Sequence, residues 1–183
     1  MTLREGTERP LEAEEQALYE VVETTGSAVV ARGAATLGVK WFRFPDQASR
    51  PMFELRPSRP DALPIAVSLG DDWIDATLDI DGEQLNFELS AETYEERLRR
   101  TRERIEAVID GRVEVELRQS RGRFFRTWGV VARFHVAGGP DETSRSPCRP
   151  NDYGHLFSRR PGDEASGLLG PRRFAPYQAD DSR

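Results

Sequence analysis

The stretch WIDATLDIDGEQLNFEL, residues 73–89, decides how this chain folds. Apolar and polar residues alternate on both sides of Asp81-Gly82, the dipeptide that type I′ turns prefer. A two-residue loop pairs Ile80 with Glu83 and so fixes the register. That register places three apolar pairs on one face: Leu78–Leu85, Ala76–Phe87 and Ile74–Leu89. Loop length and hydrophobic pattern therefore predict the same β-hairpin.

The opposite face of this hairpin is polar. Its members are Trp73, Asp75, Thr77, Asp79, Gln84, Asn86 and Glu88. In the predicted register Asp75 lies directly opposite Glu88, and like charges in that position repel each other. Burial of such a pair would raise the pKa of one carboxyl, as acid–base catalysis requires. The alternative interpretation is a pair of carboxylates on a solvated strand.

Two amphipathic helices are predicted around the strands. Leu11–Thr24 has its apolar residues near one face, and Gly26 is expected to end that helix. Ser90 is suited to cap a second helix over Ala91–Asp110, with Gly111 as its end. The apolar stripe of this second helix and its Glu–Arg pairs four residues apart are typical of a helix that lies on a sheet.

Further strands complete the predicted fold. They are Ala28–Arg32, Val39–Phe44, Met52–Arg56, Ile65–Leu69, Arg112–Arg118 and Phe124–Val136. With the hairpin they make about eight strands, and their connections are too short for parallel crossovers. The sequence thus predicts an α+β domain over residues 1–136, in which a curved, mainly antiparallel sheet packs against two helices.

Residues 137–183 change character and are predicted to form a disordered tail. This region holds half of the chain's twelve prolines and shows no hydrophobic periodicity. Two apolar islands interrupt it: Tyr153–Phe157, and the group Leu168, Leu169, Phe174 and Tyr177. We expect these islands to dock either on the folded body or on a partner.

Composition is that of a soluble protein from a reducing compartment. No apolar run approaches the ~18 residues of a membrane span, and Met1–Pro10 lacks the apolar core of a signal peptide. The single cysteine, Cys148, cannot form an internal disulfide. Lys40 is the only lysine among 26 basic residues, a bias typical of a GC-rich bacterial genome. We therefore expect a cytoplasmic protein that does not bind membranes.

The sequence contains little that supports catalysis or a cofactor. Its only histidines are His135 and His155, and it has no Gly-x-Ser-x-Gly elbow. The acids of Asp71–Asp81 lack EF-hand spacing, and the glycines of Gly33–Gly38 precede a strand rather than the helix of a phosphate loop. We predict no catalytic residue, no metal ligand and no cofactor.

Charge is distributed unevenly along the chain. The net charge of −6 disfavours binding to nucleic acid. Asp71–Glu88 holds seven acids and no base, whereas Arg112–Arg133 holds six arginines and two glutamates. These two regions either neutralise each other or act separately. In the second case the acidic hairpin face, with Trp73 at its edge, would receive a basic protein.

Ala91–Val131 resembles part of the bacterial immunity proteins of polymorphic-toxin systems. The features that carry the resemblance are a charged helix running into Asp110-Gly111-Arg112-Val113, a short strand, a basic turn and an aromatic strand that contains Trp128. Such immunity proteins are usually small acidic α+β domains. The resemblance implies a non-enzymatic inhibitor that binds a toxin or effector.

The leading hypothesis is therefore a protein-binding domain of the immunity type. Its contacts would be Trp73, Asp75, Asp79 and Glu88, and its hairpin face would block the active site of a basic partner. A secretion chaperone or adaptor is an alternative, in which the tail islands or the apolar sheet hold a client.

A small enzyme or ligand-binding protein is the third hypothesis. A curved sheet packed with helices can enclose a pocket, here lined by Trp41, Phe53 and Trp128. Arg126 interrupts the apolar positions of its strand and would serve as an anion anchor in that pocket. The sequence leaves the partner, the strand order and the oligomeric state open.

Overall fold

A computed structural model of the chain describes residues 4–43, 48–80, 83–121, 126–148 and 172–179. Its two helices are α1 (Ala13–Ala31) and α2 (Tyr94–Ile109). Its strands are β1 (Arg4–Glu5), β2 (Ala35–Arg43), β3 (Arg50–Pro57), β4 (Ile65–Leu69), β5 (Ile74–Ile80), β6 (Glu83–Leu89), β7 (Val113–Arg121), β8 (Arg126–Phe134), β9 (Glu142–Cys148) and β10 (Arg172–Arg173).

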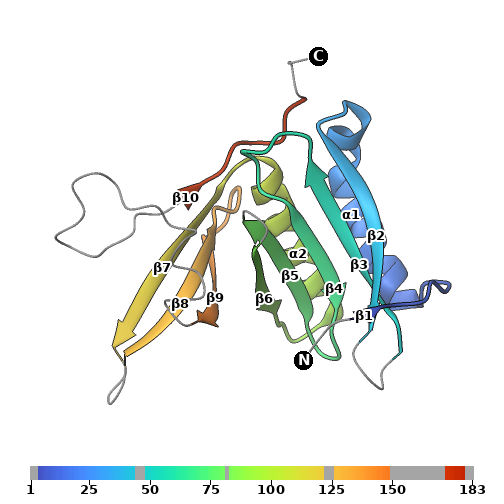
Figure 1. The fold of residues 1–183 in the computed structure, drawn as a ribbon, viewed down its shortest axis with the longest axis horizontal. Helices are drawn as coiled ribbons and strands as arrows, with labels where there is room; N and C mark the ends of the chain where they lie inside the picture. Colours follow the sequence, from blue (N-terminus) through green and yellow to red (C-terminus); the bar gives the residue numbers. More distant parts are fainter. Residues whose placement is uncertain (1–3, 44–47, 81–82, 122–125, 149–171, 180–183) are drawn as a thin grey trace.

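The strands form two sheets, which are splayed apart in Figure 1. Six strands follow one another in the order β1-β2-β3-β4-β5-β6, and the other four are ordered β10-β7-β8-β9. All of these pairings are antiparallel, and the predicted α+β class is confirmed. The single sheet of about eight strands is corrected to two sheets, because β6 and β9 come close to each other without pairing.

The β5–β6 hairpin has the register that its sequence predicts. Its apolar pairs are Ile74–Leu89, Ala76–Phe87 and Leu78–Leu85. All six of these side chains are at most 1% exposed. The alternate residues, among them Asp75 opposite Glu88, lie on the other face. The turn dipeptide Asp81-Gly82 lies outside the described residues.

Helix α1 is longer than the sequence predicts, because Gly26 does not end it. The helix runs on to Ala31, so the strand expected over Ala28–Arg32 is wrong. Gly26 is buried and serves packing instead, since a Cβ at this position would lie 2.9 Å from Cδ1 of Leu55 on β3. A side chain at residue 26 would displace the Leu55 side chain or the helix itself.

Both helices end at a glycine in the left-handed region. The backbone φ is 72° at Gly33, after α1, and 66° at Gly111, after α2. The N–H of each glycine bonds three residues back, to Val30 and to Val108 respectively, and the next N–H bonds five residues back. This is the Schellman arrangement, and the predicted end of α2 is confirmed.

Helix α2 begins at Tyr94, three residues later than expected. Thr93 is its cap, because the hydroxyl oxygen of Thr93 accepts a hydrogen bond from the Glu96 N–H at 3.2 Å. The amphipathic character of the helix is confirmed. Its buried residues are Thr101, Arg104, Ile105, Ala107 and Val108.

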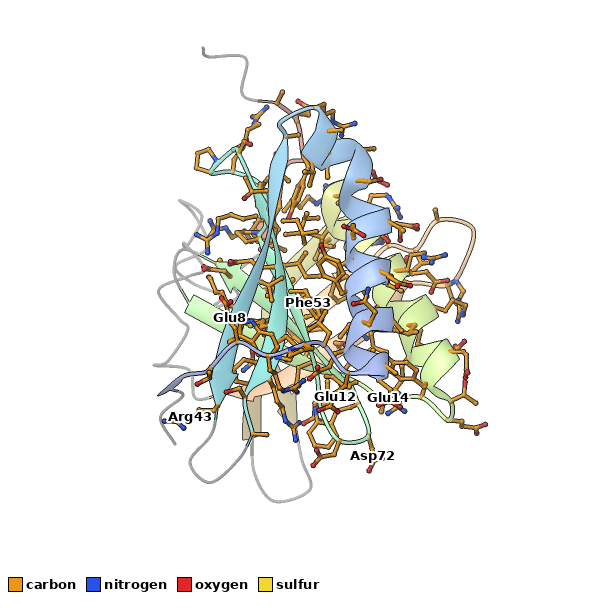
Figure 2. All side chains as sticks on the ribbon, turned by 90° about the vertical axis from the view of Figure 1, so that its right-hand side faces the viewer. Glu8, Glu12, Glu14, Arg43, Phe53 and Asp72 are labelled. Carbon is orange, nitrogen blue, oxygen red and sulfur yellow. The ribbon has the colours of Figure 1, made fainter. Side chains whose placement is uncertain are left out.

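Both helices cover the same face of the six-stranded sheet (Figure 2). Helix α1 contacts β2, β3 and β4, and α2 contacts β5 and β6. Helix α2 also contacts β8, so it lies against both sheets and closes one shared core. The second sheet adds Val113, Val115, Val130, Ala132 and Phe134 to that core. Among the described elements, no helix packs on the outer face of the six-stranded sheet.

Two segments beyond residue 136 belong to the folded body. Strand β9 pairs with β8, and β10 pairs with β7 (Figure 1). Tyr177 is 1% exposed and belongs to the core, against which Phe174 also packs. The predicted boundary at residue 136 is therefore corrected for these segments, and this part of the second island docks on the body. Residues 149–171 lie outside the described part, where a disordered tail stays a prediction.

We expect Gly111→Ala to lower the free energy of unfolding by about 2–4 kcal/mol. The left-handed backbone costs a non-glycine residue ~1–2 kcal/mol, and overpacking adds a similar amount. The added Cβ would lie 2.8 Å from the carbonyl oxygen of Phe174 and from the nitrogen of Pro176. Urea unfolding measures the effect.

Gly38→Ala is the matched control. Gly38 lies in β2 with no atom within 4 Å of an added Cβ, so its replacement should change stability by less than about 0.5 kcal/mol. Equal losses at the two glycines would contradict this account of residue 111.

Candidate protein-binding face

The outer face of the six-stranded sheet carries the residues predicted to contact a partner. Asp75 of β5 stands opposite both Ser68 of β4 and Glu88 of β6. Asp79 follows four residues later on the same face of β5, and Trp73 precedes that strand. We call these four residues, Trp73, Asp75, Asp79 and Glu88, the hairpin face.

Asp75 is the least favourably placed carboxylate of the hairpin face. Burial raises its pKa, and the neighbouring charge of Glu88 raises it further. The Trp73 indole and the Arg50 charge act in the opposite direction without cancelling the effect. Glu88 itself is exposed. In the free protein, ionised Asp75 is therefore only partly hydrated, and the charge of Arg50 compensates it only in part.

Trp73 is held at the edge of this face by a tight turn. The Gly70 N–H donates to the Trp73 carbonyl at 2.9 Å. The indole packs on Gly70 so closely that a Cβ there would lie 2.6 Å from Trp73 Nε1. That Nε1 is buried and has no hydrogen-bond partner in the described part, although it is near enough to Asp75 to favour the ionised carboxylate. The indole N–H therefore lies close to Asp75 without donating a hydrogen bond to it.

Basic residues enter the same face from β2 and β3. Arg50 forms an ion pair with Asp71 at 2.7 Å. Glu54 lies between Lys40 at 2.7 Å and Arg56 at 2.6 Å. Burial alone would raise the pKa of Glu54, but hydrogen bonds from Lys40 and Arg56 outweigh it and the pKa is lower than usual.

The outer face is thus graded in charge from one side to the other. Cations are concentrated on β2 and β3, and carboxylates on β5 and β6. The Asp79 charge also acts on Arg56. The sequence did not predict Arg50, Ser68 or Arg56 here, because their place depends on the order of the strands. The alternation of residues within β3 and β4 could have indicated that these side chains point to the polar face, but not which strands lie beside them.

The predicted pocket is not assembled by the described residues. Phe53 is 1% exposed and meets Tyr19 of α1 edge-to-face, with ring centroids 5.4 Å apart. Trp41 lies beneath the guanidinium of Arg9, 5.4 Å from the ring centroid. Trp128 and Arg126 belong to β8 in the other sheet, and their side chains lie outside the described part. Phe53 is therefore a core residue, and the role of Arg126 as an anion anchor stays a prediction.

Described bases in and beside the four-stranded sheet find acids in the same part of the molecule. Arg133 and Arg173 approach Glu114 at 3.9 and 2.7 Å. His135 places Nδ1 3.0 Å from an Asp141 oxygen, on the partly exposed side of this sheet. These three pairs involve no acid of residues 71–88.

Comparison with models of protein families, with curated proteins and with solved structures found no match to this chain. Within the described residues, His, Cys, Asp and Glu side chains do not gather in groups of three that would hold a metal ion. Neither described helix has the length and apolar character that crossing a membrane requires.

We expect Asp75→Asn to stabilise the free protein at neutral pH by about 0.5 kcal/mol, the size of a cross-strand pair. A carboxyl whose pKa is raised on folding favours the folded state at low pH, and that stability is lost as the pH rises through the raised pKa. Asp75→Asn has no carboxyl to titrate at this position, so it does not lose stability in this way as the pH rises. Its advantage should therefore vanish below the ordinary pKa of aspartate and appear at higher pH.

Thermal unfolding of both proteins over a pH series measures this difference. Thr77→Val, on the same strand and face, is an uncharged control whose effect should not vary with pH. A constant gap between the native chain and Asp75→Asn would contradict a strained carboxylate.

Proposed function

We propose that this protein is a non-enzymatic binding domain whose hairpin face receives a basic protein. One observation carries the proposal: Asp75 and Glu88 stand directly opposite each other on a sheet face that neither described helix covers. Folding alone gains nothing from this pair, because like charges opposite one another are destabilising. A cation from a partner would convert the same pair into a favourable contact.

Asp75 is partly buried, and this makes it a better partner for a cation than an exposed carboxylate. A charge that has already lost part of its hydration loses less on binding, so a partner's guanidinium gains more from it than from a fully hydrated carboxylate. Trp73 at the edge of the face supplies the kind of aromatic anchor that dominates binding energy in interfaces. The hairpin face thus combines a preorganised anion with a fixed ring.

The face has the dimensions of part of an interface. Strands of seven residues are ~24 Å long, and four neighbouring strands are ~19 Å wide, which gives roughly 450 Å². A standard interface buries ~800 Å² on each partner. The loop that contains Asp71 and Asp72, both exposed, lies beside Trp73 and would extend the contact.

An immunity-type inhibitor is the most specific form of this proposal. An acidic face is suited to occluding a basic active site, because complementary charge accelerates association and fixes the orientation. The resemblance of Ala91–Val131 to immunity proteins points the same way. Catalysis is less favoured, since Phe53 is buried in the core rather than exposed in a pocket.

The chaperone or adaptor hypothesis has less support from the described contacts. Phe174 and Tyr177, two of the apolar residues that would hold a client, pack on their own chain. Deletion of 137–183 would also remove β9 and a core tyrosine. The full chain is therefore the right bait for binding experiments.

We expect the double variant Asp75→Lys/Asp79→Lys to lose its partner. The full chain would be used to capture proteins from its native host, and the retained protein would then be purified for affinity measurement. Two reversed charges should weaken binding by about a hundredfold or more, or roughly 2.7 kcal/mol.

Glu20→Lys/Glu106→Lys is the matched control. It makes the same change in net charge on exposed positions of α1 and α2, in the helical layer behind the sheet. This control should bind as the native chain does. Unchanged affinity of the hairpin variant, or equal losses in both variants, would rule out the hairpin face as the binding surface.

A further inference from the structure

A short C-terminal segment lies in a groove built from three distant parts of the chain. We call Phe174–Gln178 the clasp segment, and the groove formed by Arg32, Asp61, Leu63, Ile109 and Gly111 the clasp groove. Figure 1 shows this segment running from β10, in one sheet, across to the other. We propose that the clasp groove is a separable peptide-binding site, filled here by the chain's own segment and able to take the same segment from a second copy.

The groove binds the backbone of the segment through alternate residues. The Ala175 N–H donates to the Asp61 carbonyl at 3.0 Å, and the Tyr177 N–H donates to the Ile109 carbonyl at 2.7 Å. Pro176, between them, has no N–H to satisfy and fixes its own φ near an extended value. Every backbone donor from residue 175 to residue 177 is therefore matched. Such pairing is how grooves bind extended peptides.

The Ile109 carbonyl is available because of how α2 ends. The Schellman turn at Gly111 satisfies the carbonyls of Ala107 and Val108 but leaves that of Ile109. On the other side of the segment, an Arg32 guanidinium N–H donates to the Tyr177 carbonyl at 3.0 Å. One helix end thus accepts a bond from the segment, and the residue after the other helix donates one.

Tyr177 is the side chain that the groove selects. It is 1% exposed, and its hydroxyl donates to the Leu63 carbonyl at 2.6 Å with the Leu55 carbonyl 3.2 Å away. Burial raises the pKa of this phenol far above its ordinary value, so it stays a donor. Phenylalanine would leave the Leu63 carbonyl without this donor, which lowers the affinity for the segment.

Gly111 gives the segment its path. A Cβ at residue 111 would lie 2.8 Å from the Phe174 carbonyl oxygen and the Pro176 nitrogen, and 3.0 Å from Ala175. No larger residue fits beside the backbone of the segment. The backbone of the segment therefore packs directly on the backbone at Gly111.

Chain length does not restrict the segment to its own groove. Twenty-three residues, 149–171, separate β9 from β10, and ~3.3 Å per residue allows them to span about 75 Å. Within one sheet, β9 and β10 are three strand spacings apart, about 14 Å. The linker is thus several times longer than this span, as exchange of the segment between copies requires.

The test uses the full chain with a specific protease site placed between residues 150 and 170. After cleavage, a fluorescent peptide with the sequence of residues 170–180 is added and its anisotropy is followed. We expect the labelled peptide to replace the cleaved segment while the body stays folded by circular dichroism. A Tyr177→Phe peptide should bind about tenfold more weakly, and a Tyr177→Ala peptide should show no binding.

Three outcomes would overturn the proposal. The first is that the body unfolds once the segment leaves, which would make the segment an inseparable part of the core. The second is that the labelled peptide fails to bind within days, although the cleaved segment can be displaced by denaturant. The third is that the Phe peptide binds as tightly as the Tyr peptide, which would mean that the hydroxyl is not recognised.

Discussion

The apolar face of the six-stranded sheet has to be covered, and α1 and α2 cover it together. Because both helices lie on this one face, the opposite face is left to polar residues. Helix α2 also meets β8, so the same apolar stripe holds the second sheet in place. The C-terminal segment then closes the end of the molecule where α2 stops, and Tyr177 completes the core. The position of the hairpin face and of the clasp groove both follow from where these helices lie.

Local signals made the hairpin and the second helix predictable. A two-residue turn and strict alternation determine the β5–β6 register, and a charged helix with one apolar stripe identified α2. Gly111 was predicted as a helix end because left-handed glycine is a local requirement. The prediction that Gly26 ends the first helix is wrong, because this glycine allows close contact with Leu55 on β3. A sequence pattern does not distinguish a glycine that ends a helix from one that admits a neighbour.

Features that depend on contacts between distant residues could not be predicted from the sequence. Strand β9 is polar and contains Pro147, so it shows no period-two pattern, and its pairing with β8 depends on a tertiary neighbour. Tyr177 packs in the core among residues far away in the chain, and its hydroxyl lies next to two of their carbonyls. The ion pair of Arg50 with Asp71 depends on β3 lying beside β4. The opposition of Asp75 and Glu88 was predictable, but the partial burial of Asp75 was not.

In the free protein, Asp75 is held without a sufficient counter-charge. Carbon-13 NMR of its side-chain carboxyl, titrated with and without an arginine-rich peptide, tests this directly. The account predicts that the free carboxyl titrates above the ordinary aspartate pKa of about 3.9, and that the peptide lowers this pKa. A carboxyl that titrates at its ordinary value and does not respond to the peptide would contradict it.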